Sequence, residues 1–229
     1  MAIEALTEKV FDGNKLSEDW LVLLEDAQMF NRYDLGKITA LLAAPCELGT
    51  IVLRDQQHSY SEDGSLKTLD TFFRTHRFLD YSLTKRCFSA IKEVSSYKVP
   101  FVNWHYTLFP LENPTNCHWL NPLDIYDLKT IQGHCYAELT NGLILKLPTQ
   151  MRSIIDQSEK AIYSLCLLRR EYSIALQHSE RPLEYLQMPN TPFLRSLQNR
   201  PLLQRWMTDP GTLQRRYLTE ALLDQKKKS

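Results

Sequence analysis

The hairpin signal at residues 134–147 constrains the fold of this chain more than any other feature of its sequence. Two runs in which apolar and polar residues alternate flank the dipeptide Asn141-Gly142. Asn and Gly tolerate the positive φ of a type I′ turn, so the pattern predicts an antiparallel β-hairpin. Pro148 ends the second strand, and apolar residues at helical spacing over 151–176 follow. The pattern predicts a sheet with a long helix packed on it.

Shorter patterns add strands and helices on the N-terminal side of this hairpin. Apolar runs at 38–44 and 49–54 predict two or three strands, and the alternation across 101–111 predicts a half-buried strand. A helix is expected over 17–30, where a serine cap precedes two acidic residues and a broad apolar face. A further helix is expected at about 81–94.

The predicted fold is α+β: a mainly antiparallel sheet with a long helix packed on it, plus a helical C-terminal tail. Beyond the long helix, prolines break the chain into an irregular connector, and two helices are expected at about 193–206 and 211–224. We divide the chain into an acidic N-terminal helical arm at 1–34, a core at 35–180 and a basic helical tail at 181–229.

Charge is balanced over the whole chain but divided along it. Lys plus Arg and Asp plus Glu each total 27 among 229 residues, and a net charge of zero argues mildly against a duplex-DNA binder. However, residues 1–31 hold seven acidic and two basic side chains, whereas 67–100 hold seven basic and three acidic, and 186–229 eight basic and three acidic. This asymmetry indicates a polyanion partner or an autoinhibitory arm, unless the charged runs are simply solvated faces.

The first basic segment, 67–100, also carries five aromatic residues between Lys67 and Lys92. A surface of this kind would place its Arg and Lys side chains along a groove. The rings are expected to be core residues that anchor the segment. The aromatic residues are Phe72, Phe73, Phe78, Tyr81 and Phe88.

Cysteine usage and the N-terminal sequence indicate a soluble cytosolic protein. Five cysteines are scattered without a CxxC pair, which suits free thiols in a reducing compartment. Residues 1–11 lack the basic and apolar regions of a signal peptide. No apolar stretch is long enough to span a membrane.

Residues that often mark enzymes or metal sites give no consistent pattern. Cys117-His118 and His134-Cys135 are two Cys/His pairs, but neighbouring residues on a strand point to opposite faces, so each pair offers one ligand easily. The sequence contains no GxSxG, P-loop or GxGxxG motif. Cys87 is the one thiol whose neighbour, Arg86, favours reactivity. We expect no enzyme, no metal and no cofactor.

An ordered series of short motifs resembles the ComK family of competence transcription factors. Residues 97–100 (Tyr-Lys-Val-Pro), a strand ending in Leu-Phe-Pro at 108–110, and 114–120 (Pro-Thr-Asn-Cys-His-Trp-Leu) match elements of that family in order and spacing. So do the hairpin with its Leu-Pro ending at 147–148 and the Leu-Arg-Arg-Glu-Tyr at 168–172. The resemblance covers about 67–178.

The sequence departs from the family at several positions. Leu111 replaces a Thr after Phe-Pro, and His118 replaces a Gly before the Trp. The family's tail carries an element read by an adaptor of a Clp protease, which residues 184–189 match only loosely. Regulated proteolysis through such an adaptor is therefore in doubt for this chain.

The resemblance implies a DNA-binding transcriptional activator of competence genes. It implies binding to AT-rich double-stranded boxes largely through the minor groove, DNA bending, a homo-oligomer, and a cytoplasmic, nucleoid-associated location without a membrane. Narrow AT-rich minor grooves concentrate negative potential, so a few well-placed cations suffice. Cys117 and Trp119 would be structural. The DNA-contacting cations would be Arg74, Arg77, Lys85, Arg86, Lys92 and Lys98.

Two other functions remain open from the sequence. One is a protein–protein interaction module of the same fold that does not bind DNA and acts through its basic C-terminal helices. The other is a metal-dependent enzyme that uses the Cys/His pairs.

Overall fold

The predicted hairpin is present, although its turn differs from the prediction. Strands β10 (His134–Leu139) and β11 (Ile144–Leu147) pair antiparallel, with Cys135 opposite Leu147. Gly142 has a φ of 87°, whereas the φ of Asn141 is not positive, and Gly142 N donates to Leu139 O at 2.9 Å. Residues 140–142 therefore form a three-residue loop, and the predicted type I′ turn is wrong. The structure is a computed structural model that describes residues 7–55, 57–76, 81–94, 96–172 and 179–228.

A type I′ geometry occurs one hairpin upstream. Strand β9 (Ile125–Ile131) joins β10 through Gln132 and Gly133, which have positive φ values of 50° and 80°. No pattern in the sequence predicted β9. Its register shifts where β10 passes from Glu138 to Leu139, so the buried residues of β9 do not alternate and the two-residue period is hidden.

The N-terminal segment completes this sheet. Strand β1 (Val10–Asp12) pairs parallel with β11, which gives a four-stranded sheet in the order β1-β11-β10-β9. An ion pair of 2.8 Å between Lys146 Nζ and Asp12 Oδ2 joins the edge strand β1 to its neighbour β11. The acidic arm is thus bound to the hairpin that lies furthest from it in sequence.

A second, seven-stranded sheet contains the strands predicted at 38–44 and 49–54. Its pairings are antiparallel except for the parallel contact of β2 with β5. The spatial order is β2 (Gln28–Met29), β5 (Gln57–Ser61), β4 (Thr50–Arg54), β3 (Ala40–Ala43), β8 (Trp119–Leu120), β7 (Thr107–Pro110) and β6 (Phe101–Val102).

The strand predicted over 101–111 is divided in two by a reversal. Asn103 Oδ1 accepts hydrogen bonds from the backbone N of His105 and of Tyr106, both at 2.8 Å. The chain therefore turns, and β6 and β7 pair with each other as a short hairpin. Alternation of apolar residues continues across the turn, which explains why the sequence pattern indicated one strand.

The first helix, α1 (Glu18–Glu25), begins as predicted and ends earlier. Ser17 Oγ accepts from Trp20 N at 3.3 Å, which confirms the serine cap. The backbone then leaves the helix and forms β2, so the helix predicted to run to residue 30 is too long.

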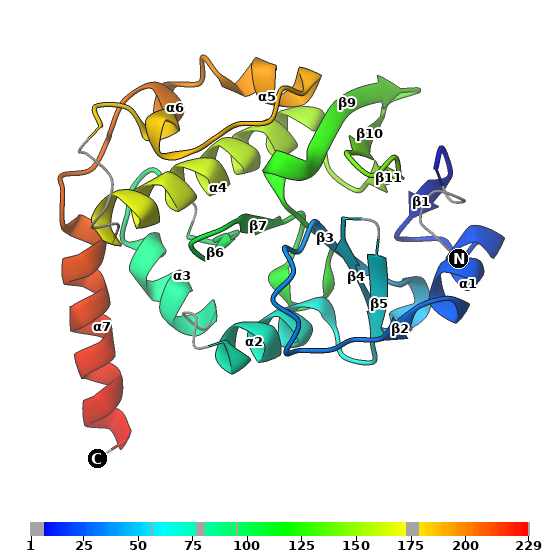
Figure 1. The fold of residues 1–229 in the computed structure, drawn as a ribbon, viewed down its shortest axis with the longest axis horizontal. Coiled ribbons are helices and arrows are strands. Elements are labelled where there is room, and N and C mark those ends of the chain that lie inside the picture. Colours follow the sequence, from blue (N-terminus) through cyan, green and yellow to red (C-terminus); the bar gives the residue numbers. More distant parts are fainter. Residues whose placement is uncertain (1–6, 56, 77–80, 95, 173–178, 229) are drawn as a thin grey trace.

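Three helices lie on the second sheet and beside it (Figure 1). Helix α2 (Ser65–Thr75) was not predicted, α3 (Tyr81–Ser89) occupies the first part of the predicted 81–94, and α4 (Met151–Tyr172) is the predicted long helix. Helix α4 packs against β6, β7 and β9. The last residues of the 151–176 prediction, 173–176, lie outside the described residues.

The tail contains α5 (Pro192–Leu197), α6 (Pro201–Gln204) and α7 (Thr212–Lys228). The predicted helix at 193–206 is interrupted because Pro201 begins a new helix and Arg200 adopts an extended conformation. Arg200 also holds α4, since its Nε donates to Glu159 Oε2 at 2.7 Å.

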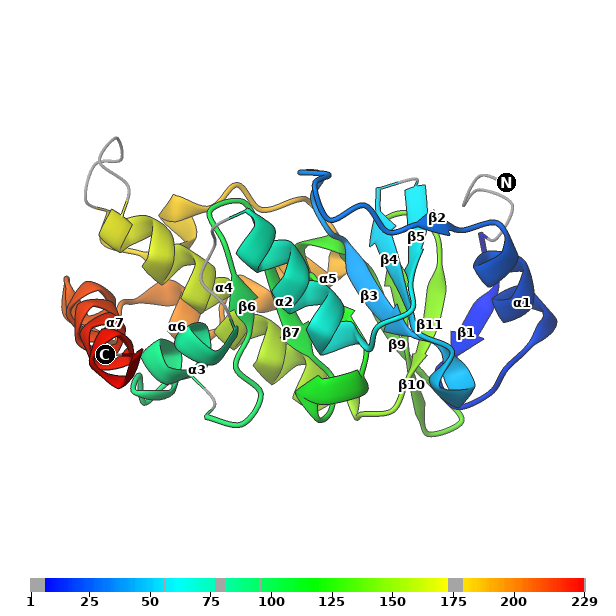
Figure 2. The ribbon, with the colours of Figure 1, turned by 90° about the horizontal axis from the view of Figure 1, so that it is seen from below.

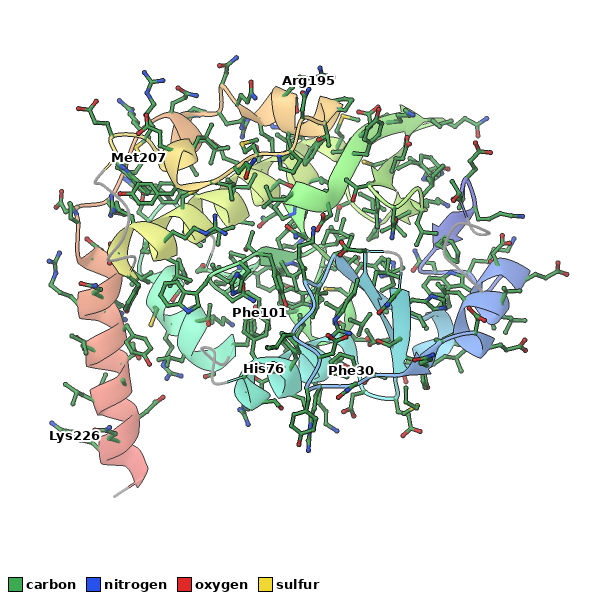
Figure 3. The ribbon with its side chains drawn as sticks, in the orientation of Figure 1. Phe30, His76, Phe101, Arg195, Met207 and Lys226 are labelled. Atoms are coloured by element: carbon green, nitrogen blue, oxygen red, sulfur yellow. The ribbon has the colours of Figure 1, made fainter. Side chains whose placement is uncertain are left out.

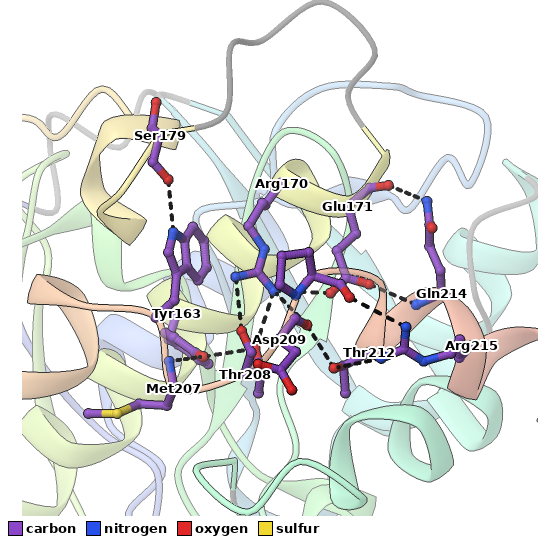
Figure 4. A network of polar contacts seen from close by, with 12 residues as sticks. Tyr163, Arg170, Glu171, Ser179, Met207, Thr208, Asp209, Thr212, Gln214 and Arg215 are labelled. Atoms are coloured by element: carbon purple, nitrogen blue, oxygen red, sulfur yellow. Dashed lines mark hydrogen bonds and ion pairs between the residues drawn. The ribbon is translucent and has the colours of Figure 1, made fainter.

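One buried arginine fixes the tail to the end of α4 (Figure 4). Arg170 Nη1 donates to Thr208 O at 3.2 Å, and its guanidinium lies 4.0 Å from the centroid of the Trp206 ring. The neighbouring Glu171 accepts from Gln214 N at 2.8 Å. The tail is therefore attached to the C-terminal end of α4 through polar contacts and a cation–π contact.

The fold class is α+β, as predicted, with mostly antiparallel sheets, the long helix α4 and a helical tail. One apolar cluster includes Trp20 from the N-terminal arm, Leu165 from α4 and Leu213 from the tail. In both views α1 and α7 lie at opposite ends of the long axis (Figures 1 and 2). Among the described residues, no helix has the length and apolar character to cross a membrane.

Candidate nucleic-acid interface

The first basic segment folds into α2 and α3, and a cleft lies between them. Its volume is about 720 Å³. Helix α2 contributes Lys67, Asp70 and Arg74, spaced so that they lie along one side of the helix, and α3 contributes Lys85. The other lining residues are Glu47, Gly49, Glu62, Gly64, Leu66, Tyr81, Ser82, Thr115 and Asn116.

Two of the six predicted DNA-binding cations meet at this cleft, Arg74 and Lys85. Arg74 Nε lies 2.8 Å from Asp70 Oδ2, but its side chain is 66% exposed. Such an exposed pair contributes little stability and can exchange its partner for a phosphate. Lys85 is exposed, and no ion pair is found for it within the described residues.

Lys67 is a cation of this cleft that the predicted site omits. Its Nζ lies 2.7 Å from Asp63 Oδ1, and its side chain is 74% exposed. It lies two helical turns from Arg74. Lys67 was missed because helix α2 was not predicted. Only in a helix do residues 67 and 74 lie on one face.

Arg86, next to Lys85 in sequence, is turned toward the C-terminal helix instead. Its Nε lies 2.8 Å from Glu220 Oε2 and its Nη2 2.5 Å from Asp224 Oδ2. The carboxylate of Glu220 is nearly buried, at 8% exposure. In the structure Arg86 therefore holds α3 to α7.

The remaining predicted cations do not line the cleft. Lys98 Nζ donates to Leu111 O, and Lys92 is exposed in the turn after α3. Arg77 lies outside the described residues. The structure thus brings together Arg74 and Lys85, and separates them from Arg86, Lys92 and Lys98.

Of the five aromatic residues between Lys67 and Lys92, those that the structure describes are core residues, as expected, whereas Tyr97 of the same segment is 59% exposed. Tyr81 packs 4.8 Å from Phe101 and 5.6 Å from Trp119 between ring centroids, and Phe73 lies 4.5 Å from Phe101. Phe101 is labelled in Figure 3. Phe72 and Phe88 are also buried, whereas Phe78 lies outside the described residues. These rings fix both helices beneath the cleft.

The cleft is not uniformly positive. Glu47, Glu62 and Asp70 line it beside the three cations. Carboxylates weaken the attraction of a continuous phosphate chain, so the positive surface is limited to the Lys67–Arg74 side of α2 and to Lys85. The Tyr81 hydroxyl at the cleft is buried, and it forms no hydrogen bond with any other described residue.

Cys87 and Cys117 lie in surroundings that favour the protonated thiol. Burial raises the pKa of both Cys87 and Cys117 to about 11. A thiol rather than a thiolate predominates at neutral pH, so the reactivity that Arg86 suggested for Cys87 is absent. Cys117 and Trp119 are buried together in one apolar cluster, in agreement with the structural role expected of them.

The two Cys/His pairs do not converge. Cys117 packs in the cluster beneath the cleft, whereas Cys135 belongs to the main core and His134 is exposed. His118 is buried, and its Nδ1 accepts from Ala43 N at 3.0 Å. Across the described ranges, no group of three or more His, Cys, Asp or Glu side chains is placed to hold a metal ion.

No family model, curated protein or solved structure matches this chain.

Proposed function

We propose that this chain binds duplex DNA as a transcriptional regulator of the competence type, with AT-rich minor grooves as its target. The observation that supports the proposal is the convergence of Lys67, Arg74 and Lys85 on the α2–α3 cleft. The ordered resemblance to the ComK family supplies the AT-rich boxes, the activation of competence genes and the location at the nucleoid.

Exposed cations of this kind suit the electrostatics of DNA. Each contact between a cation and a phosphate releases condensed counterions and so raises the affinity for DNA. A protein with a net charge of zero can therefore still bind DNA through a few local contacts. AT-rich minor grooves are narrow and strongly negative, which favours the insertion of Arg or Lys. Arg74 and Lys67 reach solvent from one helix face, and Lys85 reaches it from the next helix.

The proposed contact surface is smaller than the sequence indicates. Lys67, Arg74 and Lys85 form this surface, whereas Lys92 is exposed but does not line the cleft. Arg86 and Lys98 already have protein partners, so we assign them to the stability of the fold.

The test is binding to an AT-box duplex, a scrambled duplex and a GC-rich duplex by gel shift. The triple variant Lys67→Ala/Arg74→Ala/Lys85→Ala is expected to bind the AT-box about 10- to 100-fold more weakly, because three phosphate contacts are lost. The matched control is Arg152→Ala/Arg195→Ala, which removes exposed arginines from α4 and α5. Equal affinity of both variants would show that DNA binds elsewhere, or that the chain does not bind DNA.

The alternative, a protein-interaction module of the same fold, is favoured by the outer face of α7. That helix exposes Leu218, Leu222 and Leu223 to 61%, 58% and 46%. A wild-type chain that binds no duplex at low salt would leave this alternative as the better proposal. An adaptor of a Clp protease would be one class of partner to test.

A further inference from the structure

The outer face of α1 combines acidic and apolar side chains at the N-terminal end of the molecule. Glu18, Leu21, Val22 and Glu25 are spaced i, i+3, i+4 and i+7, so they share one face of the helix. All four are exposed, Leu21 to 44% and Val22 to 37%. Within the described residues, neither Glu18 nor Glu25 forms an ion pair. We call these four residues the acidic patch.

The outer face of α7 combines basic and apolar side chains at the opposite end. Arg215, Leu218, Leu222 and Lys226 are spaced i, i+3, i+7 and i+11, and all are exposed. Lys226 is labelled near the free end of the helix in Figure 3. The other side of α7 contacts α3, where Glu220 is buried. We call these four residues the basic patch.

The two patches are complementary in chemistry and in order. Each has two apolar side chains between two charges, and the charges have opposite sign. The charged residues are separated by about 10 Å along α1 and about 16 Å along α7 at the helical rise. The Arg and Lys side chains are long enough to bend inward over that difference while their stems cover the leucines.

Two patches of the same kind repel each other, so each patch binds the other kind and not its own. Two copies of α7 side by side would bring Arg215 and Lys226 of both chains together, and two copies of α1 would bring four glutamates together. Only the pairing of α1 with α7 joins opposite charges and covers apolar surface on both sides.

We propose that α1 of one copy docks on α7 of a second copy, head to tail. The patches lie at opposite ends of the long axis (Figures 1 and 2), so one chain cannot satisfy its own patches, and repetition of the contact extends a row. An interface of one short helix on another is small, so the association is weak, reversible and sensitive to salt. This inference does not rest on DNA binding.

The first test is sedimentation velocity of the nuclease-treated full chain without DNA, over concentrations reaching hundreds of micromolar at low salt. The wild type is expected to form species that grow with concentration. The variants Glu18→Lys/Glu25→Lys and Arg215→Glu/Lys226→Glu should each weaken association at least about tenfold. The quadruple variant, with both patches reversed, should regain it.

The second test separates a head-to-tail contact from a two-fold one. Leu21→Gln/Val22→Gln blocks the acidic patch, and Leu218→Gln/Leu222→Gln blocks the basic patch, while charges and helix propensity are kept. Each chain alone should be monomeric. An equimolar mixture should give a dimer and nothing larger, because it contains one intact patch of each kind.

The control variant is Leu35→Gln, which removes an apolar side chain exposed to 71% and located in neither patch. It should associate as the wild type does, and near-ultraviolet circular dichroism checks that every variant is folded. A wild type that stays monomeric, patch variants that associate normally, or a mixture that forms no dimer would each overturn the proposal.

Discussion

The α2–α3 cleft and the junction of α4 with the tail both depend on basic side chains, but they place them in opposite surroundings. At the cleft, Lys67 and Arg74 are exposed and each has one carboxylate neighbour. At the junction, the Arg170 side chain is 4% exposed and bonds to Thr208, Asp209 and Glu171. A cation with several buried partners holds the fold, whereas an exposed one remains able to exchange its partner for a ligand.

Arg86 shows that position in sequence does not decide between these two roles. It follows Lys85 directly, but it faces Glu220 and Asp224 on α7 while Lys85 lines the cleft. The comparison therefore predicts different results when neighbouring cations are removed.

The largest loss of stability is expected at the junction of α4 with the tail. Arg170→Met removes the hydrogen bonds to the tail and leaves the 1% exposed Glu171 without its basic partner. We expect the free energy of unfolding to fall by about 3–5 kcal/mol. Urea denaturation measures it, with Arg152→Met, an exposed arginine of the same helix, as the control. A loss below about 1 kcal/mol would show that the junction is not held by this arginine.

His118 is a basic residue that is buried in its neutral form. Burial lowers the pKa of His118 to about 4, although Asp12 partly offsets this. The unfolded chain binds a proton at this residue near pH 6.5, whereas the folded chain does so only near pH 4. Stability is therefore highest above pH 6.5 and falls by about 3 kcal/mol as the pH drops to 4.

Denaturation curves between pH 7 and pH 4 check this, with His118→Gln as the variant whose slope should be reduced. Burial also lowers the pKa of His58, so this residue adds to the same window. His58→Gln is the control that keeps the contribution of His118. Equal slopes for the wild type and His118→Gln would contradict the assignment.

A smaller effect separates the two neighbouring cations of α3. Arg86→Ala should lower the free energy of unfolding by about 1–2 kcal/mol, because the nearly buried Glu220 then keeps only Arg216 as a basic partner among the described residues. Lys85→Ala should change it by less than about 0.5 kcal/mol, since the side chain is exposed. Thermal unfolding of both variants is the measurement. Equal losses would remove the distinction between a structural and a free cation.

Local patterns predicted much of the fold where a short stretch of chain decides the structure. The Ser17 cap, the hairpin ending at residue 147 and α4 all depend on neighbouring residues. The divided strand at Asn103 and the missed β9 depend on a side-chain turn and on a register shift, which interrupt or hide the two-residue period.

The candidate site was harder to predict because it depends on contacts between distant segments. The basic segment was visible in the sequence, and the described aromatic residues between Lys67 and Lys92 are in the core as expected. Which cations face the cleft depends on the orientation of α2 and on two carboxylates of α7. These are Glu220 and Asp224, which lie more than 130 residues from Arg86 in sequence and bind its guanidinium. No pattern within 67–100 contains that information.

The salt dependence of DNA binding shows whether the exposed cations of the α2–α3 cleft contact DNA phosphates. The slope of log Kd against log salt for an AT-box duplex would be measured by fluorescence anisotropy for the wild type, Lys85→Ala and Arg152→Ala. Phosphate contact by these cations predicts a slope that is smaller by about one for Lys85→Ala and unchanged for Arg152→Ala. A wild-type affinity that does not vary with salt, or identical slopes for all three chains, would contradict it.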